Sequence, residues 1–214
     1  MRRDAPGDTE AFTTEAIALA GLDRLDELDS LVEECRSLPG GECDAGLVMM
    51  GASWYLAGRG HRAKCVEYGN RATDLMESLP EDELMRREQD YLYALRAAER
   101  WDEYAALAKR RTERLEKGSF QYAYALSCVG MAAGHRGDRV TAEAVISELE
   151  VSEDLYNAAF VAGYLGDLDR AIDYLRRSLE HPEGNTYAHL ARWDLDLEPL
   201  WGYEPFEELV RPKG

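Results

Sequence analysis

The segment that decides the fold lies near the C-terminal end of the chain. It runs Ala159-Phe160-Val161-Ala162-Gly163-Tyr164-Leu165-Gly166-Asp167-Leu168-Asp169-Arg170-Ala171-Ile172-Asp173-Tyr174-Leu175-Arg176-Arg177-Ser178-Leu179. Apolar residues recur at helical spacing on both sides of Gly166, and glycine suits the left-handed backbone that often ends a helix. Ala159 and Ala171 put small side chains where two helices must approach closely. The segment therefore predicts a helix, a tight turn and a second helix.

Similar turns recur earlier in the chain. If Gly21, Gly60, Glu99, Gly137 and Gly166 are equivalent points, the steps between them are 39, 39, 38 and 29 residues. A near-constant step is typical of stacked helix pairs, because no pair buries its apolar face alone. No period-two strand pattern lasts long enough to compete. We therefore expect an all-α fold of about five stacked antiparallel helix pairs.

These helix pairs resemble the tetratricopeptide repeat (TPR), most specifically over residues 118–185. Small residues recur at the two positions where paired helices meet: Ala159 and Ala171, Gly130 and Ala142, and Ser53 and Cys65. The unit around Glu99 departs from the pattern, with Leu92 and Tyr104 at these positions. The resemblance implies a right-handed α-solenoid over residues 9–186.

The two ends of the chain differ from the repeats. Residues 1–8 are polar and are expected to be flexible. Residues 187–214 resemble the tail that closes TPR regions in bacterial signalling proteins with a kinase, adenylate cyclase or winged-helix output domain. This likeness implies that the chain is the C-terminal part of a longer protein. The tail is expected to cap the last helix pair through its apolar side chains, Leu197, Leu200, Trp201, Phe206 and Leu209.

The chain is strongly acidic, with a net charge of −17 and a pI of about 4.6. This charge argues against nucleic acid and anionic membrane surfaces as partners, because both would be repelled. It allows a cationic partner, but an acid-rich, lysine-poor composition also fits a salt-adapted source in which acidity maintains solubility. Both interpretations stay open. No apolar stretch is long enough to span a membrane and no secretory signal begins the chain, so we expect a cytoplasmic location.

No catalytic or cofactor motif is present. The chain lacks zinc-site spacings, phosphate-binding glycine loops and a nucleophile elbow, so we expect no enzyme activity, cofactor or metal. The histidines, at turns and beside the last loop, are expected to be ordinary surface residues: His61, His135, His181 and His189. The carboxylates of one acidic helix are expected to form a solvated face: Asp23, Asp26, Glu27, Asp29, Glu33 and Glu34.

The cysteines Cys35, Cys43, Cys65 and Cys128 form no C-x-x-C pair. We expect reduced, buried or half-buried thiols, as in a cytosolic protein. Cys35 and Cys43 flank the turn at residues 38–41 and could approach one another.

A partner would bind along the first helix of each pair, which lines the concave side of a TPR solenoid. Counting back ten and six residues from each turn gives the candidate groove residues: Met50, Trp54, Gln89, Tyr93, Ser127, Met131, Tyr156 and Phe160. A spacing of four places each pair on one helix face. Aromatic residues and methionine recur at binding hot spots and adaptable surfaces. We therefore expect a protein-interaction scaffold that binds a peptide or helix of another protein.

Three alternatives remain. An aromatic stripe at helical spacing is often core, so the same residues could be buried between helices. The solenoid could instead associate with a second copy of itself. A small-molecule sensor with a pocket inside the superhelix is a third, less favoured function.

Overall fold

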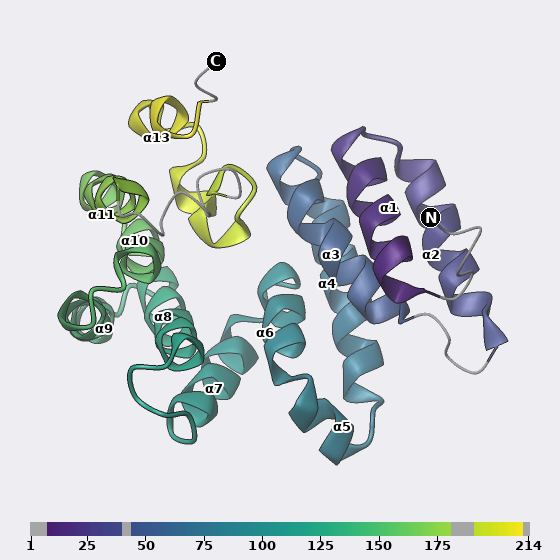
Figure 1. The fold of residues 1–214 in the computed structure, drawn as a ribbon, viewed down its shortest axis with the longest axis horizontal. Coiled ribbons are helices and arrows are strands. Elements are labelled where there is room, and N and C mark those ends of the chain that lie inside the picture. Colours follow the sequence, from purple (N-terminus) through teal and green to yellow (C-terminus); the bar gives the residue numbers. More distant parts are fainter. Residues whose placement is uncertain (1–7, 40–43, 181–190, 212–214) are drawn as a thin grey trace. The chain divides into compact units, whose positions relative to one another are not determined.

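The chain folds into helices joined by short turns (Figure 1). The computed structural model describes residues 8–39, 44–180 and 191–211, and no strand occurs among them. The all-α prediction is therefore confirmed. Residues 1–7 and 187–190, which belong to the predicted flexible and capping segments, lie outside the described residues. The contacts divide the chain into two compact units, residues 1–100 and 101–214.

Unit 1 is a layered set of helices around an apolar core. Its helices are α1 (Thr9–Gly21), α2 (Leu25–Ser37), α3 (Ala45–Gly58), α4 (Arg62–Glu77), α5 (Glu81–Arg86) and α6 (Glu88–Ala97). Helix α1 packs on α2 and α3, and α4 packs on α3 and α6. Asp8 and Asp44 begin α1 and α3 by accepting hydrogen bonds from the backbone N–H groups of Glu10 and Leu47. Each helix pair thus stacks on the next.

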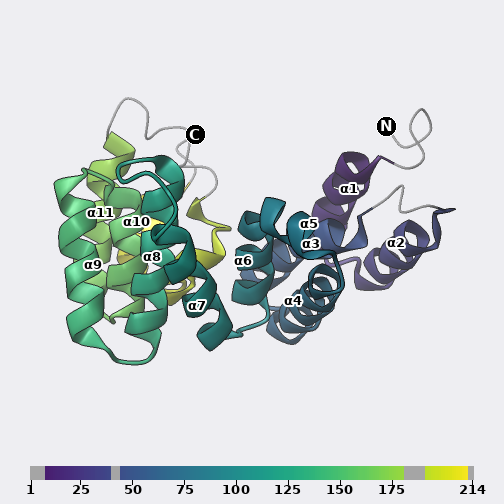
Figure 2. The same ribbon diagram turned by 90° about the horizontal axis from the view of Figure 1, so that it is seen from below.

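Unit 2 repeats this arrangement and adds a short C-terminal segment (Figure 2). Its elements are α7 (Trp101–Thr112), α8 (Phe120–His135), α9 (Arg139–Val151), α10 (Leu155–Tyr164), α11 (Leu168–Glu180), the 3₁₀ helix η3 (Leu195–Leu200) and α13 (Glu204–Leu209). Helix α8 packs on α7, α9 and α10, and α10 packs on α11. The C-terminal segment contacts these helices, because η3 packs on α10 and α13 packs on α11. None of the described helices has both the length and the apolar character needed to cross a bilayer.

The turn inside each helix pair contains one residue with a positive φ. These residues are Asp23 (59°), Gly60 (86°), Glu99 (59°), Gly137 (76°) and Gly166 (82°). Glu99 is therefore a true equivalent of the glycines, whereas Gly21 is the last residue of α1. The predicted register of the first pair was wrong by two residues, and the first step is 37 rather than 39. Aspartate tolerates the left-handed region better than most residues, so a search for glycine misplaced this turn.

Small residues lie where paired helices meet, as the sequence predicted. Ala159, Ala171 and Ala142 are fully buried. A side chain on Gly130 would place its Cβ 2.7 Å from Val161 and 2.8 Å from Val145, so α8 can approach α9 and α10 only because glycine stands there. The division between the units falls after Arg100, in the turn of the pair that lacks small residues.

The cysteines differ from one another. Cys65 and Cys128 are free buried thiols, and burial raises the pKa of Cys128 far above its usual value, so it is a poor nucleophile. Cys35 is disulfide-bonded, so the expectation of a reduced thiol is wrong for this residue. Cys43 lies outside the described residues. A disulfide is typical of oxidising compartments and does not favour the predicted cytoplasmic location.

Candidate functional site

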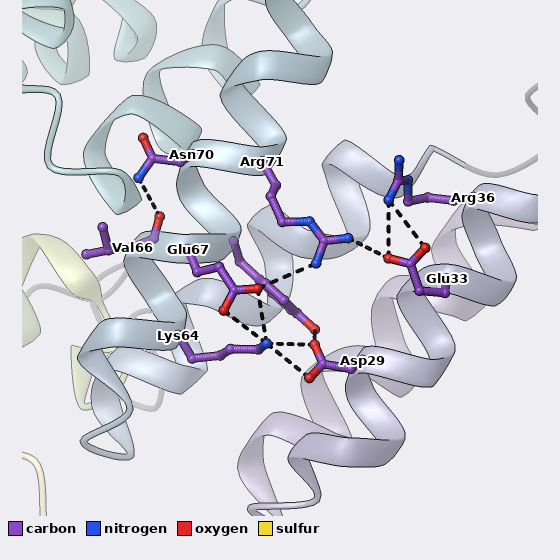
Figure 3. Close-up of polar contacts among 9 residues, drawn as sticks. Asp29, Glu33, Arg36, Lys64, Val66, Glu67, Asn70 and Arg71 are labelled. Atoms are coloured by element: carbon purple, nitrogen blue, oxygen red, sulfur yellow. Dashed lines mark hydrogen bonds and ion pairs between the residues drawn. The ribbon is translucent and has the colours of Figure 1, made fainter.

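The second helices of neighbouring pairs are joined by a polar cluster, which we call the clamp. In unit 1 the clamp joins α2 to α4 (Figure 3). Lys64 Nζ lies 2.8 Å from one Asp29 oxygen and 3.1 Å from Glu67, while the Tyr68 hydroxyl donates to Asp29 at 2.6 Å. One turn along, Arg71 pairs with Glu33 at 2.6 Å. Asp29 therefore forms an ion pair with Lys64 and accepts a hydrogen bond from the hydroxyl of the buried Tyr68.

Unit 2 builds the same clamp between α9 and α11. Arg170 pairs with Glu143 at 2.7 Å, and the buried Tyr174 donates to Glu150. Lys64 and Arg170 each lie four residues after the positive-φ glycine of their turn, and Tyr68 and Tyr174 each lie eight residues after it. In both cases the cation lies over the tyrosine ring, at 4.9 Å for Lys64 and 5.4 Å for Arg170. The clamp is thus a repeated feature of the architecture.

Three carboxylates of the acidic segment at residues 23–34 bind side chains of the next helix pair. Asp23 accepts from Arg59 Nε at 3.2 Å and lies 3.0 Å from His61, and Asp29 and Glu33 bind α4. Asp23 and Glu33 are exposed, as the sequence predicts, and Asp29 is half-buried, but all three carboxylates also pair with side chains of the next helix pair. Their charges are already partnered within the chain, so this face is ill suited to recruit a cationic ligand.

The clamp and the contacts of Asp23 make the stability of unit 1 depend on pH. Hydrogen bonds from Arg59 and His61 lower the pKa of Asp23 to about 2, and the pKa of Glu33 is lowered mainly by Arg71. Desolvation acts to raise the pKa of Asp29, but hydrogen bonds from Lys64 and Tyr68 outweigh it and the pKa is lowered. Because these values lie below those of the unfolded chain, the stabilisation is present above about pH 4 and is lost as the pH falls towards 2.

We therefore expect unit 1 to unfold at a lower urea concentration at pH 3 than at pH 7. Trp54 reports this transition, since it is the only tryptophan in residues 1–100. Asp29→Asn should cost about 0.5–1 kcal/mol at pH 7 and flatten the pH dependence. Asp26→Asn, at an exposed position on the same helix, is the control. An equal pH dependence in the Asp29→Asn chain would contradict the assignment.

The first helices of unit 1 carry a half-buried, uncharged surface, which we call the A face. The predicted groove residues Met50 and Trp54 on α3, and Gln89 and Tyr93 on α6, are all half-buried. Trp54 and Tyr93 come from different helices, and their rings meet edge to face with centroids 5.2 Å apart. The structure therefore brings these two predicted residues together.

The corrected turn at Asp23 adds two residues to the A face. Counting back ten and six residues from Asp23 gives Thr13 and Ile17 on α1, and both are half-buried. A Cβ on Gly51 would lie 2.7 Å from Thr13 and 3.8 Å from Ile17, so these side chains lie directly against α3. The A face thus runs over three helices. Sequence reasoning missed the two residues because it placed the turn at Gly21.

In unit 2 the corresponding positions are mostly buried. Ser127 and Met131 on α8 are fully buried and Phe160 on α10 is 3% exposed, whereas Tyr156 is half-buried. Ser127 Oγ donates to the Tyr124 carbonyl and bonds the Asn157 side chain at 3.2 Å. Burial at these positions favours the alternative in which the stripe forms core.

The C-terminal segment lies on this same face of unit 2. The Tyr124 hydroxyl donates to the buried Asp196 at 2.9 Å, and the Tyr156 hydroxyl donates to Asp194 at 3.0 Å. A Cβ on Gly163 would contact Pro199 and Leu200. Tyr124 shares a helix face with Ser127 and Met131, and Tyr156 shares one with Phe160 and Gly163, because their spacings are three, four and seven residues. The first helices of unit 2 therefore hold a short segment of their own chain.

The apolar residues of the tail are buried or half-buried. Leu197, Leu200 and Phe206 are buried, while Trp201 and Leu209 are half-buried. Among the described residues, η3 packs along α10, and α13 packs on the last helix of the pairs, α11.

Within residues 8–39, 44–180 and 191–211, no group of three or more histidine, cysteine or acidic side chains could hold a metal ion. His61 bonds Asp23, and the His135 ring stacks on Trp101 with centroids 4.2 Å apart. His181 and His189 lie outside the described residues.

Comparison with protein-family models, curated proteins and solved structures finds no match to this chain.

Proposed function

We propose that the chain is a TPR-type protein-interaction scaffold, a right-handed α-solenoid of about five helix pairs. Its A face in unit 1 binds a short extended or helical segment of a partner protein. The scaffold serves as the regulatory or recruiting module of a larger bacterial signalling protein. We infer that this face binds rather than catalyses, because its side chains are uncharged and mostly apolar or aromatic.

The observation that supports this proposal most strongly is the internal segment in unit 2. There the first helices bind η3, a short 3₁₀ segment that contains Leu195, Leu197, Pro199 and Leu200. Two tyrosine hydroxyls fix its carboxylates, and apolar side chains fill the interface. Among the described residues of unit 1, α3 and α6 pack on other α-helices, and no 3₁₀ helix packs along them as η3 packs along α10. The A face lies at the corresponding positions of the first helices in unit 1. Its half-buried aromatic side chains, Trp54 and Tyr93, are available to contact a partner segment.

The expected result is that the A face retains the partner. Trp54→Ser with Tyr93→Ser should weaken capture of a partner from the source organism by more than thirtyfold, since truncating a hot-spot aromatic costs about 2 kcal/mol or more. The measurement compares quantitative pulldowns with the unaltered chain and the variant, after circular dichroism shows that both are folded.

Val140→Ser is the matched control, because Val140 is an apolar residue that is 81% exposed on α9, in unit 2. It should capture the partner as the unaltered chain does. Equal capture by the A-face variant would refute the proposal. Recovery of the chain itself as the captured protein would favour self-association instead.

A further inference from the structure

The segment that the first helices of unit 2 hold is acidic. Residues 194–200 contain three carboxylates and neither lysine nor arginine. Its two aspartates bind hydroxyls at defined positions of the helix pairs. Tyr124, which binds Asp196, lies thirteen residues before the positive-φ glycine of its turn, and Tyr156, which binds Asp194, lies ten residues before that of its own turn. The same two positions can be compared in each helix pair of unit 1.

The first two pairs of unit 1 do not offer such hydroxyls. In α3 the two positions hold Leu47 and Met50, whose side chains cannot donate a hydrogen bond. In α1 they hold Glu10 and Thr13, and the Thr13 hydroxyl already donates to the Thr9 carbonyl at 2.8 Å. A carboxylate of a partner segment would therefore find no equivalent of the two tyrosines and would meet the negative charge of Glu10.

The third pair of unit 1 is no better suited to a carboxylate. Its two positions hold Arg86 and Gln89. Arg86 lies on α5 rather than on the first helix, α6, and it pairs with Asp82 at 3.0 Å. An acidic partner segment would have to compete with Asp82 for this cation.

The charge balance of unit 1 favours a cationic partner. Residues 1–100 contain 12 lysines and arginines against 21 aspartates and glutamates, a net charge of −9. Glu10 is exposed, forms no ion pair with the described residues, and shares a helix face with Thr13 at the edge of the A face. The lysines and arginines of residues 8–39 and 44–100 that are not buried all pair with carboxylates: Arg24, Arg36, Arg59, Arg62, Lys64, Arg71, Arg86, Arg87 and Arg100.

The aromatic pair on the A face adds a second attraction for cations. Trp54 and Tyr93 meet with ring centroids 5.2 Å apart, and both side chains are half-buried. The faces of indole and phenol rings attract ammonium and guanidinium groups, and tryptophan does so most strongly. A lysine or arginine of a partner segment would gain from these rings and from the surrounding negative charge together.

We propose that the segment bound by the A face is basic. It carries apolar side chains, as η3 does, but lysine or arginine where η3 has aspartate. One cation pairs with Glu10 and another lies against Trp54 and Tyr93, while the apolar side chains contact Ile17 and Met50. This inference rests on the proposed function of the A face and adds the chemistry of the partner. It also excludes the acidic segment of a second copy of the chain as the occupant.

The test measures the fluorescence anisotropy of labelled peptides with the full chain. The natural peptide is residues 192–202, and the basic peptide carries Asp194→Lys, Asp196→Lys and Glu198→Lys. A third peptide keeps these lysines and has serine in place of its leucines. The basic peptide should bind saturably, about tenfold or more tightly than the natural peptide, and more weakly at about 0.5 M salt. The serine peptide should bind about tenfold or more weakly than the basic peptide, because it lacks the apolar contacts.

Variants of the chain locate the binding to the A face. Trp54→Ser with Tyr93→Ser should weaken binding of the basic peptide by about tenfold or more. Glu10→Lys should weaken it by about fivefold and should strengthen binding of the natural peptide. Asp26→Asn, which removes an exposed carboxylate from α2, should leave both unchanged. If the Glu10→Lys chain does not fold, Glu10→Gln gives the same comparison with a loss of about twofold.

Three results would overturn the inference. They are no saturable binding of the basic peptide, equal binding of the serine peptide, and equal binding of the natural and basic peptides. In the last case, loss of binding in the Trp54→Ser, Tyr93→Ser chain would still leave the A face as a docking surface. The proposed function fails on a different result, namely that no partner segment is captured through the A face.

Discussion

Removal of residues 195–214 is expected to unfold unit 2. The removed segment buries Leu195, Leu197, Leu200 and Phe206 against the remaining helices. Each such side chain contributes about 1.5–3 kcal/mol on burial, so the loss of all four amounts to about 6–12 kcal/mol. This is comparable to the whole stability of a small domain, about 5–15 kcal/mol. The Tyr124 hydroxyl would also lose its carboxylate partner, Asp196.

Hydrogen exchange of α8 and α10, followed by mass spectrometry, measures this effect. In the shortened chain their amides should exchange orders of magnitude faster than in the full chain. A chain that ends at Leu209 is the control, because it keeps η3 and α13. Slow exchange of both helices in the shortened chain would show that unit 2 folds without the segment, and that the segment is not part of its core.

Replacing Gly69 with valine is expected to destabilise unit 1 by about 3 kcal/mol or more. A Cβ at this position would lie 2.4 Å from the backbone nitrogen of Ala98 and 2.6 Å from the carbonyl carbon of Ala97. Backbone atoms cannot rotate away as a flexible side chain can, so α4 and the end of α6 must separate. Their separation would also disturb Tyr93, which lies on α6 beside Trp54.

Urea unfolding monitored by Trp54 fluorescence tests this prediction. Gly21→Ala is the control, because a Cβ there meets nothing within 4 Å and alanine is the better helix former. That variant should be as stable as the unaltered chain or slightly more stable. A Gly69→Val chain that unfolds at the same urea concentration would show that the packing of α4 on α6 is looser than described.

The helix pairs could be predicted because their signals are local. Apolar spacing, small residues at helix crossings and polar turns are all visible within about forty residues of sequence. The turn at Asp23 was misplaced for a physical reason, since a non-glycine residue adopts the left-handed backbone there. Placing the turn at Asp23 puts Asp29 and Glu143 at the same position, six residues after their turns, where each pairs with the cation of the next helix pair. The clamp could then have been recognised as a repeated pattern.

The burial of the candidate site in unit 2 could not be predicted from local pattern. Tyr124 and Asp196 are 72 residues apart, and Tyr156 and Asp194 are 38 residues apart. Helical spacing gave the right helix face for Tyr156 and Phe160, but it carries no information about a distant segment that binds the same face. The two interpretations of the aromatic stripe therefore apply to different halves of the chain, with a half-buried face in unit 1 and a mostly buried one in unit 2.

Site-specific photo-cross-linking tests the proposed function of the A face most directly. A photoreactive amino acid is placed at residue 93, at residue 54, or at residue 71 on α4, and the cross-linked peptides are identified by mass spectrometry. We predict that residues 93 and 54 cross-link to one and the same segment of a partner protein, and that residue 71 does not. Cross-links to that segment from residue 71 alone, or none from residues 93 and 54 beyond the chain itself, would contradict the proposal that this face binds a partner.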